Sequence, residues 1–194
     1  MGGTPVPFHT RKNFLSIHEM KTFIEVGSCD FNTLNYLSDY GWKGVIVEPI
    51  KKYLNNIEQK PNIHYLNYAV DKTSGVREMK VASDEQVERD RDYAGMSSFI
   101  SENELLEDTK LVNTITFEKI FNLCDITQID ILKIDAEGYD LELIKAFPFH
   151  LIKPKYIRVE VEHIDILEMG GILSSHGYHC DYDTTDIFAI LVTE

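Results

Sequence analysis

Short apolar runs alternate with segments of helical spacing along most of this chain. Residues 22–27 form a run rich in strand-forming side chains, and Gly27 ends it. From Phe31 onward, apolar residues recur at Leu34 and Leu37, a spacing that a helix buries on one side. The stretch therefore predicts a strand, a tight glycine turn and a helix. Such a turn directs backbone N–H groups toward the carboxyl end of the strand, where open α/β sheets bind ligands.

The same alternation continues toward the C-terminus. Two final strands, 178–182 and 187–192, are joined by so few residues that they should form an antiparallel hairpin. Strands that alternate with helices and end in a hairpin predict a mostly parallel sheet with an antiparallel edge. The other predicted strands are 44–48, 63–70, 112–116, 130–135 and 156–162, and the predicted helices are 31–40, 50–59, 117–124, 138–147 and 164–176.

The stretch 71–111 breaks this rhythm. Residues 76–82 partly alternate and predict an edge strand. Residues 83–92 have almost no apolar side chains, which predicts a solvated loop. We expect a single domain over residues 1–194, with an N-terminal arm at 1–20 and an insertion or acceptor-side region at 71–111.

Composition narrows the classes of partner. The chain has 194 residues and a formal net charge of −13, which argues against nucleic acid or an anionic membrane surface as the main partner. No apolar run has the length of a membrane span, and the N-terminus lacks a signal-peptide core. Three cysteines without a C-x-x-C motif are typical of a reducing setting, so we expect a cytoplasmic protein.

The first turn is a candidate nucleotide-binding site, although it contains only one glycine. Gly27 stands where a dinucleotide-binding turn would carry G-x-G-x-x-G, which counts against a nicotinamide-dependent oxidoreductase. Glu48 ends the second strand 21 residues later, close to the spacing of an acid that holds ribose hydroxyls. A plain turn and a solvated acid would use the same residues, so the hypothesis depends on Glu25, Gly27 and Glu48 together.

One segment resembles a known family. The run Ile131-Leu-Lys-Ile-Asp-Ala-Glu-Gly-Tyr-Asp-Leu-Glu-Leu-Ile-Lys145 is similar to the hallmark segment of the FkbM methyltransferases. The resemblance covers roughly residues 22–163 and implies a Rossmann-like class I methyltransferase fold, an α/β fold with a seven-stranded sheet. It also implies S-adenosylmethionine as cofactor and often a hydroxyl oxygen as acceptor. Supporting pieces follow in the family's order: Ile24-Glu-Val-Gly27, Val47-Glu-Pro49, Asn67-Tyr-Ala-Val70, Met96-Ser-Ser-Phe99 and Val159-Glu-Val-Glu162.

The resemblance gives the turn and strand-end residues roles in binding the cofactor. Gly27 would let the methionine part approach the backbone, while Glu25 or Asp30 holds its ammonium group. Glu48 would accept from the ribose hydroxyls, and Asp71 would lie at the edge that touches adenine. Asp30 could equally cap the following helix. Family members usually carry a second glycine in this turn, where the present chain has Cys29.

The acceptor side is expected above the fourth and fifth strands. Asp135 would lie next to the sulfonium, and either Asp135 or His163 could take the acceptor's proton. Asp135, Glu160 and His163 together could hold Mg²⁺, although their spacing is not diagnostic. Glu137 either joins this site or only starts the helix. Lys133 is predicted to pair with Glu160 across neighbouring strands.

The sequence thus predicts an S-adenosylmethionine-dependent methyltransferase that modifies a hydroxyl group of a small molecule or sugar. Two alternatives remain open at this point. One is a nicotinamide-dependent oxidoreductase, and the other is a cofactor-binding module without chemistry of its own. Affinity for S-adenosylmethionine compared with NAD separates the two enzymes, and methylation of an acceptor separates an enzyme from a binding module.

Overall fold

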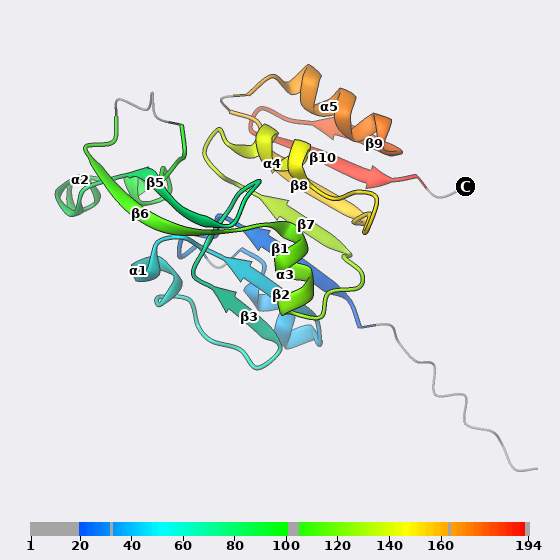
Figure 1. Cartoon of the computed structure of the whole chain (residues 1–194), viewed down its shortest axis with the longest axis horizontal. Helices are drawn as coiled ribbons and strands as arrows, with labels where there is room; N and C mark the ends of the chain where they lie inside the picture. The colour runs from blue at the N-terminus through cyan, green and yellow to red at the C-terminus, as the bar shows by residue number, and fades with distance from the viewer. Residues whose placement is uncertain (1–19, 32, 101–104, 163, 193–194) are drawn as a thin grey trace, which may run out of the picture.

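A computed structural model describes residues 20–31, 33–100, 105–162 and 164–192. A seven-stranded sheet lies at its centre, in the order β3–β2–β1–β7–β8–β10–β9 (Figure 1). Neighbouring strands are parallel except around β10, which runs antiparallel to both β8 and β9. The predicted parallel sheet and C-terminal hairpin are therefore confirmed. The strands are β1 (Thr22–Val26), β2 (Lys43–Val47), β3 (Ile63–Leu66), β7 (Ile131–Ile134), β8 (Tyr156–Glu160), β9 (Tyr178–Tyr182) and β10 (Asp186–Leu191).

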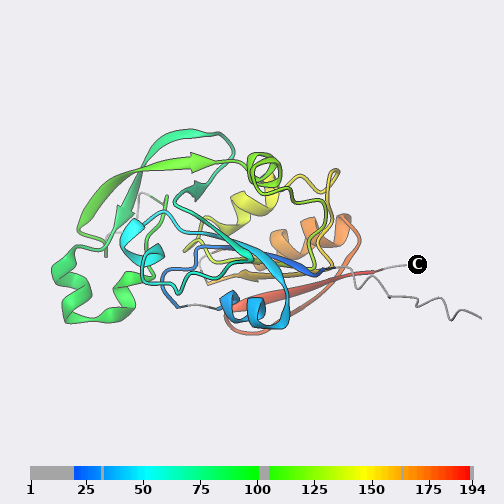
Figure 2. The ribbon, with the colours of Figure 1, turned by 90° about the horizontal axis from the view of Figure 1, so that it is seen from below.

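Helices cover both faces of this sheet (Figure 2). Alternate side chains of a strand point to opposite faces. Ile24 of β1 therefore packs into the larger core, under α3 (Phe117–Leu123), α4 (Asp140–Ala146) and α5 (Ile166–Ser175). Phe23 points the other way, into a smaller core beneath the 3₁₀ helix η1 (Asn35–Tyr40) and α1 (Lys51–Leu54). No helix in the described part of the chain is long and apolar enough to cross a membrane.

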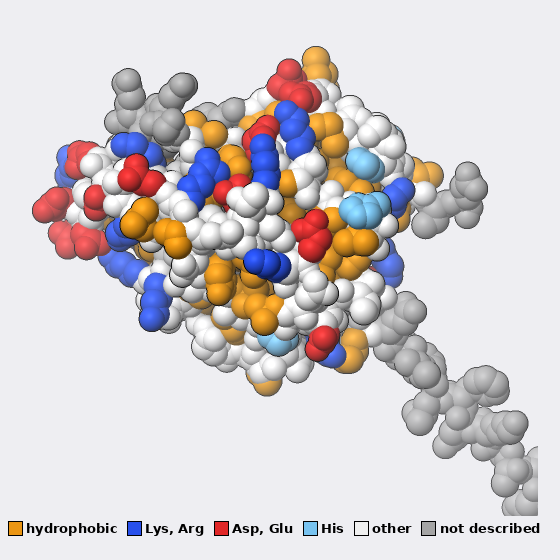
Figure 3. Space-filling model, in the orientation of Figure 1, with side chains coloured by type: hydrophobic (Ala, Val, Ile, Leu, Met, Phe, Trp, Pro, Cys, Tyr) orange, Lys and Arg blue, Asp and Glu red, His pale blue; other side chains and the backbone are white. Residues whose placement is uncertain are grey.

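A second, three-stranded sheet forms beside the carboxyl ends of the central strands (Figure 1). Its order is β4–β6–β5, and β5 and β6 form a long antiparallel ribbon. Two short helices follow β5, and acidic side chains gather around the first of them (Figure 3). This unit supplies one wall of the cleft described below. Its elements are β4 (Ala69–Val70), β5 (Gly75–Val81), α2 (Asp84–Arg89), η2 (Arg91–Ala94) and β6 (Asp108–Ile115).

Two sequence predictions are wrong in this region. The predicted strand 63–70 divides into β3 and β4, which belong to different sheets. Asn67 lies at the division, and its side-chain amide donates to the Glu48 and Pro49 carbonyls over 2.9 and 2.8 Å. The predicted loop 83–92 contains α2, which a capping box at its N-terminus stabilises although the segment has few apolar side chains.

Two predicted helices are shorter than expected. Among its described residues, the segment 31–40 is helical only over η1. Leu34, which precedes η1, donates its N–H to the Glu25 carboxylate over 3.0 Å. Gly41 ends η1 in a left-handed conformation, which glycine adopts readily. The segment 50–59 is helical only over α1, which ends at two asparagines, residues that favour helices weakly.

Candidate active site

The first turn brings the ends of three strands together. Gly27 follows β1 with φ +75°, a conformation that favours glycine, and its N–H donates to the Val47 carbonyl of β2 over 3.0 Å. A Cβ atom at Gly27 would lie 1.7 Å from the backbone carbonyl oxygen of Asp135, just beyond β7. The position therefore requires glycine for its conformation and for the close approach of the β7 end.

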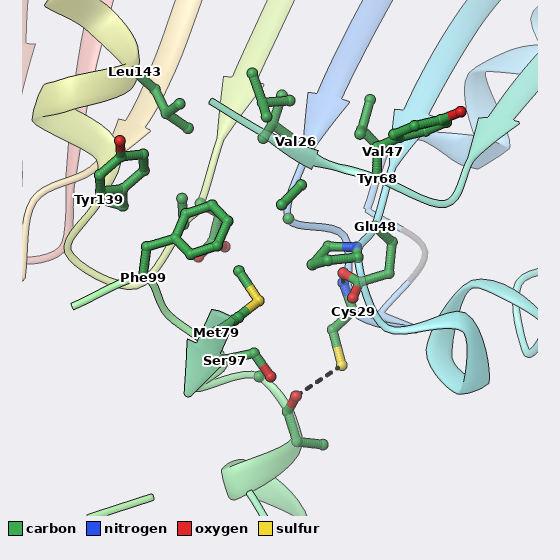
Figure 4. Close-up of a pocket in the computed structure, with 18 residues that line it drawn as sticks. Val26, Cys29, Val47, Glu48, Tyr68, Met79, Ser97, Phe99, Tyr139 and Leu143 are labelled. Atoms are coloured by element: carbon green, nitrogen blue, oxygen red, sulfur yellow. Dashed lines mark hydrogen bonds between the residues drawn. The ribbon is translucent and has the colours of Figure 1, made fainter. Parts of the chain in front are cut away.

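A cleft opens above this turn. It encloses about 510 Å³, including its opening to solvent, and lies between the ends of the central strands and the second sheet. Glu48 and Asp135 are its acidic lining residues, and most of the other walls are apolar. Figure 4 shows the apolar side chains of Val26, Val47, Met79, Phe99 and Leu143 around the cleft.

Glu48 is fixed at the wall of the cleft. Its side chain is buried, Oε1 accepts the Ile50 N–H, and Oε2 accepts the Cys29 N–H, each over 2.8 Å. Burial raises the pKa of Glu48 to about 7, although the two backbone donors favour its charged form. Each carboxylate oxygen can accept more than one hydrogen bond, so Glu48 can also accept from two neighbouring hydroxyl groups of a ligand.

Cys29 and Asp30 connect the first turn to η2. Cys29 adopts φ +45°, and its thiol donates to the Ala94 carbonyl over 3.6 Å. Asp30 forms an ion pair with Arg91 and accepts from the Asn56 amide over 2.9 Å. Because η1 begins only at residue 35, Asp30 does not cap that helix. Its carboxylate lies outside the cleft lining and holds η2 against the turn.

Glu25, Lys133 and Asp135 form a row of charges. The strand register places Glu25 of β1 directly opposite Lys133 of β7, and Arg158 of β8 lies on the other side of Lys133. Lys133 Nζ lies 3.0 Å from Asp135 Oδ2 and 3.6 Å from Glu25 Oε1. The predicted pair between Lys133 and Glu160 is therefore wrong, because the register gives the lysine a different acidic neighbour. Glu25 lies below the cleft and does not line it.

Asp71 supports the cleft from behind. Its Oδ1 accepts from the Tyr139 hydroxyl over 2.8 Å, and its Oδ2 pairs with Arg77 at 3.0 Å. Burial alone would raise the pKa of Asp71, but these donors hold it below its ordinary value. The Arg77 guanidinium lies 4.1 Å from the centre of the Phe99 ring. Tyr139 and Phe99 line the cleft, so Asp71 acts on its shape through them.

A group of carboxylates lies next to Asp135. One oxygen each of Asp135, Glu137 and Glu160 lies within 4.8 Å of the others, close enough to contact a single cation. Burial, reinforced by the negative charge of Asp135, raises the pKa of Glu137 to about 7 and that of Glu160 to about 8. The structure thus brings together two of the three residues predicted for Mg²⁺. The third, His163, lies outside the described residues.

Sequence reasoning missed several residues of the site. Tyr139 lies within the hallmark run Ile131–Lys145, and its place in that run could have indicated that it belongs to the site. Phe99 lies in the stretch 71–111, and the piece Met96–Phe99 of the resemblance was the available signal for it. Met79 comes from the same stretch, and it reaches the cleft only because the second sheet folds over it. No local pattern in the sequence marks that arrangement.

Comparisons with known proteins bear on this site. A family model described as the methyltransferase FkbM domain matches residues 25–180. Comparison with curated proteins gives no match. Among solved structures, the chain is similar to a precorrin-6y C5,15-methyltransferase from Geobacter metallireducens GS-15, with 13% identity, a TM-score of 0.46 and coverage of 92% of this chain and 84% of that one. It is also similar to a ribosomal protein L11 methylase from Lactobacillus delbrueckii subsp. bulgaricus, with 11% identity, a TM-score of 0.47 and coverage of 92% and 73%.

Proposed function

Because the chain belongs to the FkbM family of methyltransferases, we propose that it transfers the methyl group of S-adenosylmethionine to a hydroxyl oxygen of a small molecule or sugar. The observation that carries this proposal is the first turn. At this turn, Gly27 and the buried carboxylate of Glu48 lie together at the carboxyl ends of parallel strands. The Asp135 carbonyl leaves no room for a side chain at Gly27.

The residues of the cleft fit this cofactor. Gly27 lines the cleft and has no side chain, so its backbone is open to the methionine part. Glu48 offers two fixed oxygens to the two ribose hydroxyls. Ala69 and Val70 supply an apolar surface for adenine, and Asp71 stabilises that wall through Tyr139. Of the other predicted cofactor ligands, Glu25 and Asp30 lie outside the cleft lining and support its walls.

Methyl transfer requires mainly that the acceptor oxygen is aligned with the methyl group. The cofactor supplies a methyl group that its sulfonium already activates, so the protein has to orient the acceptor oxygen and take its proton. Asp135 lines the cleft and is about one-third exposed, which suits a proton acceptor that meets the substrate. His163, outside the described residues, is the second candidate for this role. The free thiols of Cys29, Cys124 and Cys180 support a reducing compartment, in line with the cytoplasmic location expected above.

Calorimetric titration with S-adenosylmethionine, S-adenosylhomocysteine and NAD tests the cofactor. We expect both sulfur compounds to bind and NAD not to bind. Glu48→Ala should weaken binding at least about tenfold, because two hydrogen bonds to a charged group are lost. Glu58→Ala is the matched control, since its side chain is largely exposed just after α1. Equal affinities for the wild type and Glu48→Ala would remove Glu48 from the site.

The acceptor class needs a second experiment. Cofactor labelled in the methyl group is incubated with a panel of sugars and polyols, and the products are treated with mild base. A methyl ether formed on a hydroxyl group survives this treatment, whereas a methyl ester formed on a carboxylate is hydrolysed. A label that base releases, or that appears only on nitrogen, would contradict methylation of a hydroxyl. Binding of the cofactor without any transfer would favour the non-catalytic module.

A further inference from the structure

We infer that Lys133 and Glu25 are positioning residues that fix the carboxylate of Asp135 at the wall of the cleft. The inference deepens the proposed function and rests on it, because it assumes that Asp135 meets the cofactor and acceptor. Lys133 lies in β7 and Asp135 follows just beyond its end, and Lys133 donates to the Asp135 carboxylate over 3.0 Å. Glu25 lies on the neighbouring strand, directly opposite Lys133.

A buried lysine such as Lys133 destabilises the fold unless oppositely charged groups lie close to it. Lys133 is 6% exposed and Glu25 is fully buried, in strands whose other side chains are mostly apolar. Placing charges there without close partners is strongly unfavourable, and an apolar side chain of similar length would fill the space as well. The partners are present, because the ammonium lies 3.0 Å from Asp135 Oδ2 and 3.6 Å from Glu25 Oε1.

Glu25 is anchored so that it can hold the lysine. Its Oε2 accepts the Leu34 N–H over 3.0 Å, whereas Oε1 has no hydrogen bond and faces the Lys133 ammonium. Burial would lower the pKa of Lys133, but Asp135 and Glu25 raise it above its ordinary value, so the lysine stays charged. Arg158, its other neighbour, makes two hydrogen bonds of 2.8 Å to Asp186.

The row of charges has a consequence for ligand choice. Lys133 holds Oδ2 of Asp135, which orients the carboxylate where it lines the cleft. A carboxylate held there favours the cationic S-adenosylmethionine over the neutral S-adenosylhomocysteine. A positioning role and a simple charge effect then predict opposite results for Lys133→Met. If the lysine acts only as a positive charge, its removal raises the preference for the cation. If it positions Asp135, its removal lowers that preference.

The experiment measures the dissociation constants of both compounds and their ratio. We expect Asp135→Asn and Lys133→Met each to lower the preference for S-adenosylmethionine at least about fivefold, the factor that one charge pair contributes at about 4 Å in water. Lys133→Arg keeps the charge and should restore most of the preference. Lys119→Met removes an exposed lysine from α3 and serves as the matched control.

The possible outcomes distinguish a failure of the proposed function from a failure of the positioning role alone. If the wild type binds neither compound, the proposed function fails and this inference fails with it. If both bind, but Lys133→Met keeps or raises the preference while Asp135→Asn lowers it, only the positioning role is overturned. An unchanged preference in Asp135→Asn also overturns it, because the carboxylate would then not face the sulfonium. Should Lys133→Met fail to fold by circular dichroism, Lys133→Gln provides the same comparison with a polar side chain.

Discussion

At the scale of single residues, Gly27 and Gly41 form a natural comparison. Both adopt positive φ, but a Cβ atom at Gly27 would collide with a backbone carbonyl, whereas one at Gly41 would meet nothing within 4 Å. Gly41→Ala should therefore cost only the conformational penalty of about 1–2 kcal/mol. Gly27→Ala should cost at least about 3 kcal/mol, because the backbone itself has to move. Urea denaturation measures both, and equal losses would show that the close approach of Asp135 does not restrict Gly27.

Glu48 should make cofactor binding depend on pH. Its pKa is raised to about 7, so the carboxylate is mostly protonated below that value and mostly charged above it. The charged form accepts from both ribose hydroxyls, so affinity for S-adenosylmethionine should rise about tenfold from pH 6 to pH 8. Glu48→Gln cannot ionise and should bind weakly with a nearly flat profile. A wild-type profile as flat as that of the variant would contradict the role of Glu48.

The location of two site residues could be predicted where spacing along the chain carried the signal, while their roles in cofactor binding stay predictions. The turn at Gly27 and the strand-end acid Glu48 both lie at the cleft, as the sequence indicated. The partner of Lys133 could not be predicted in this way. Glu25 and Glu160 both lie on strands next to β7, and only the register shows that Glu25 faces the lysine while Arg158 faces it from the other side.

At the scale of elements, a hairpin specified by local sequence was predicted, whereas a helix that also depends on a long-range contact was missed. The hairpin of β9 and β10 was predictable because a short connection leaves no room for a parallel return. Helix α2 was missed because its stability comes from a capping box and from Gln86, which is buried against the chain near Leu105. Few apolar side chains mark it in the sequence.

The connection between η2 and the first turn leads to a prediction about motion. Arg91 pairs with Asp30 and lies over the Tyr53 ring, with its guanidinium carbon 5.6 Å from the ring centre. Arg91→Ala should loosen η2 and speed amide hydrogen exchange over residues 92–97 roughly fivefold, which corresponds to about 1 kcal/mol. Arg89→Ala is the matched control, since this neighbouring arginine pairs with exposed Glu107 at 3.4 Å. Similar exchange in both variants would mean that the Arg91 contacts do not hold η2.

At the scale of the whole molecule, buried acids should set the response of stability to pH. Burial is the main cause that raises the pKa of Asp140 to about 6, of Glu48 and Glu137 to about 7, and of Glu160 to about 8. Between about pH 5 and pH 8 the folded chain therefore holds more protons at these groups than the unfolded chain does. Stability should fall as pH rises through this window.

Thermal denaturation without ligand checks this expectation. The Tm at pH 6 should exceed the Tm at pH 8, and the formal net charge of −13 acts in the same direction through repulsion between acidic groups. Glu160→Gln should reduce the difference, because the amide does not ionise. A Tm that rises across this range would contradict the assignment of these carboxyl groups as mainly protonated at low pH.

The overall architecture was largely predictable. The predicted strands 76–82 and 112–116 are confirmed as β5 and β6, but their assembly into a separate second sheet was not predicted. Regular alternation of strands and helices indicates a parallel sheet, and the hallmark run indicates its family. The second sheet and its surroundings depend on contacts between segments far apart in the sequence, such as the pairing of β4 with β6 and the contact of Cys29 with Ala94. Neither contact leaves a periodic pattern in the chain.

The second sheet has a consequence for how such an enzyme can diversify. One side of the cleft belongs to the central strands, while the other comes from a ribbon inserted between β3 and α3. Surface insertions tolerate changes of length and sequence better than core strands do. Natural variation in the ribbon can therefore remodel one wall of the cleft while the glycine turn and its carboxylate are inherited unchanged. Selection can therefore act on the two walls of the cleft separately.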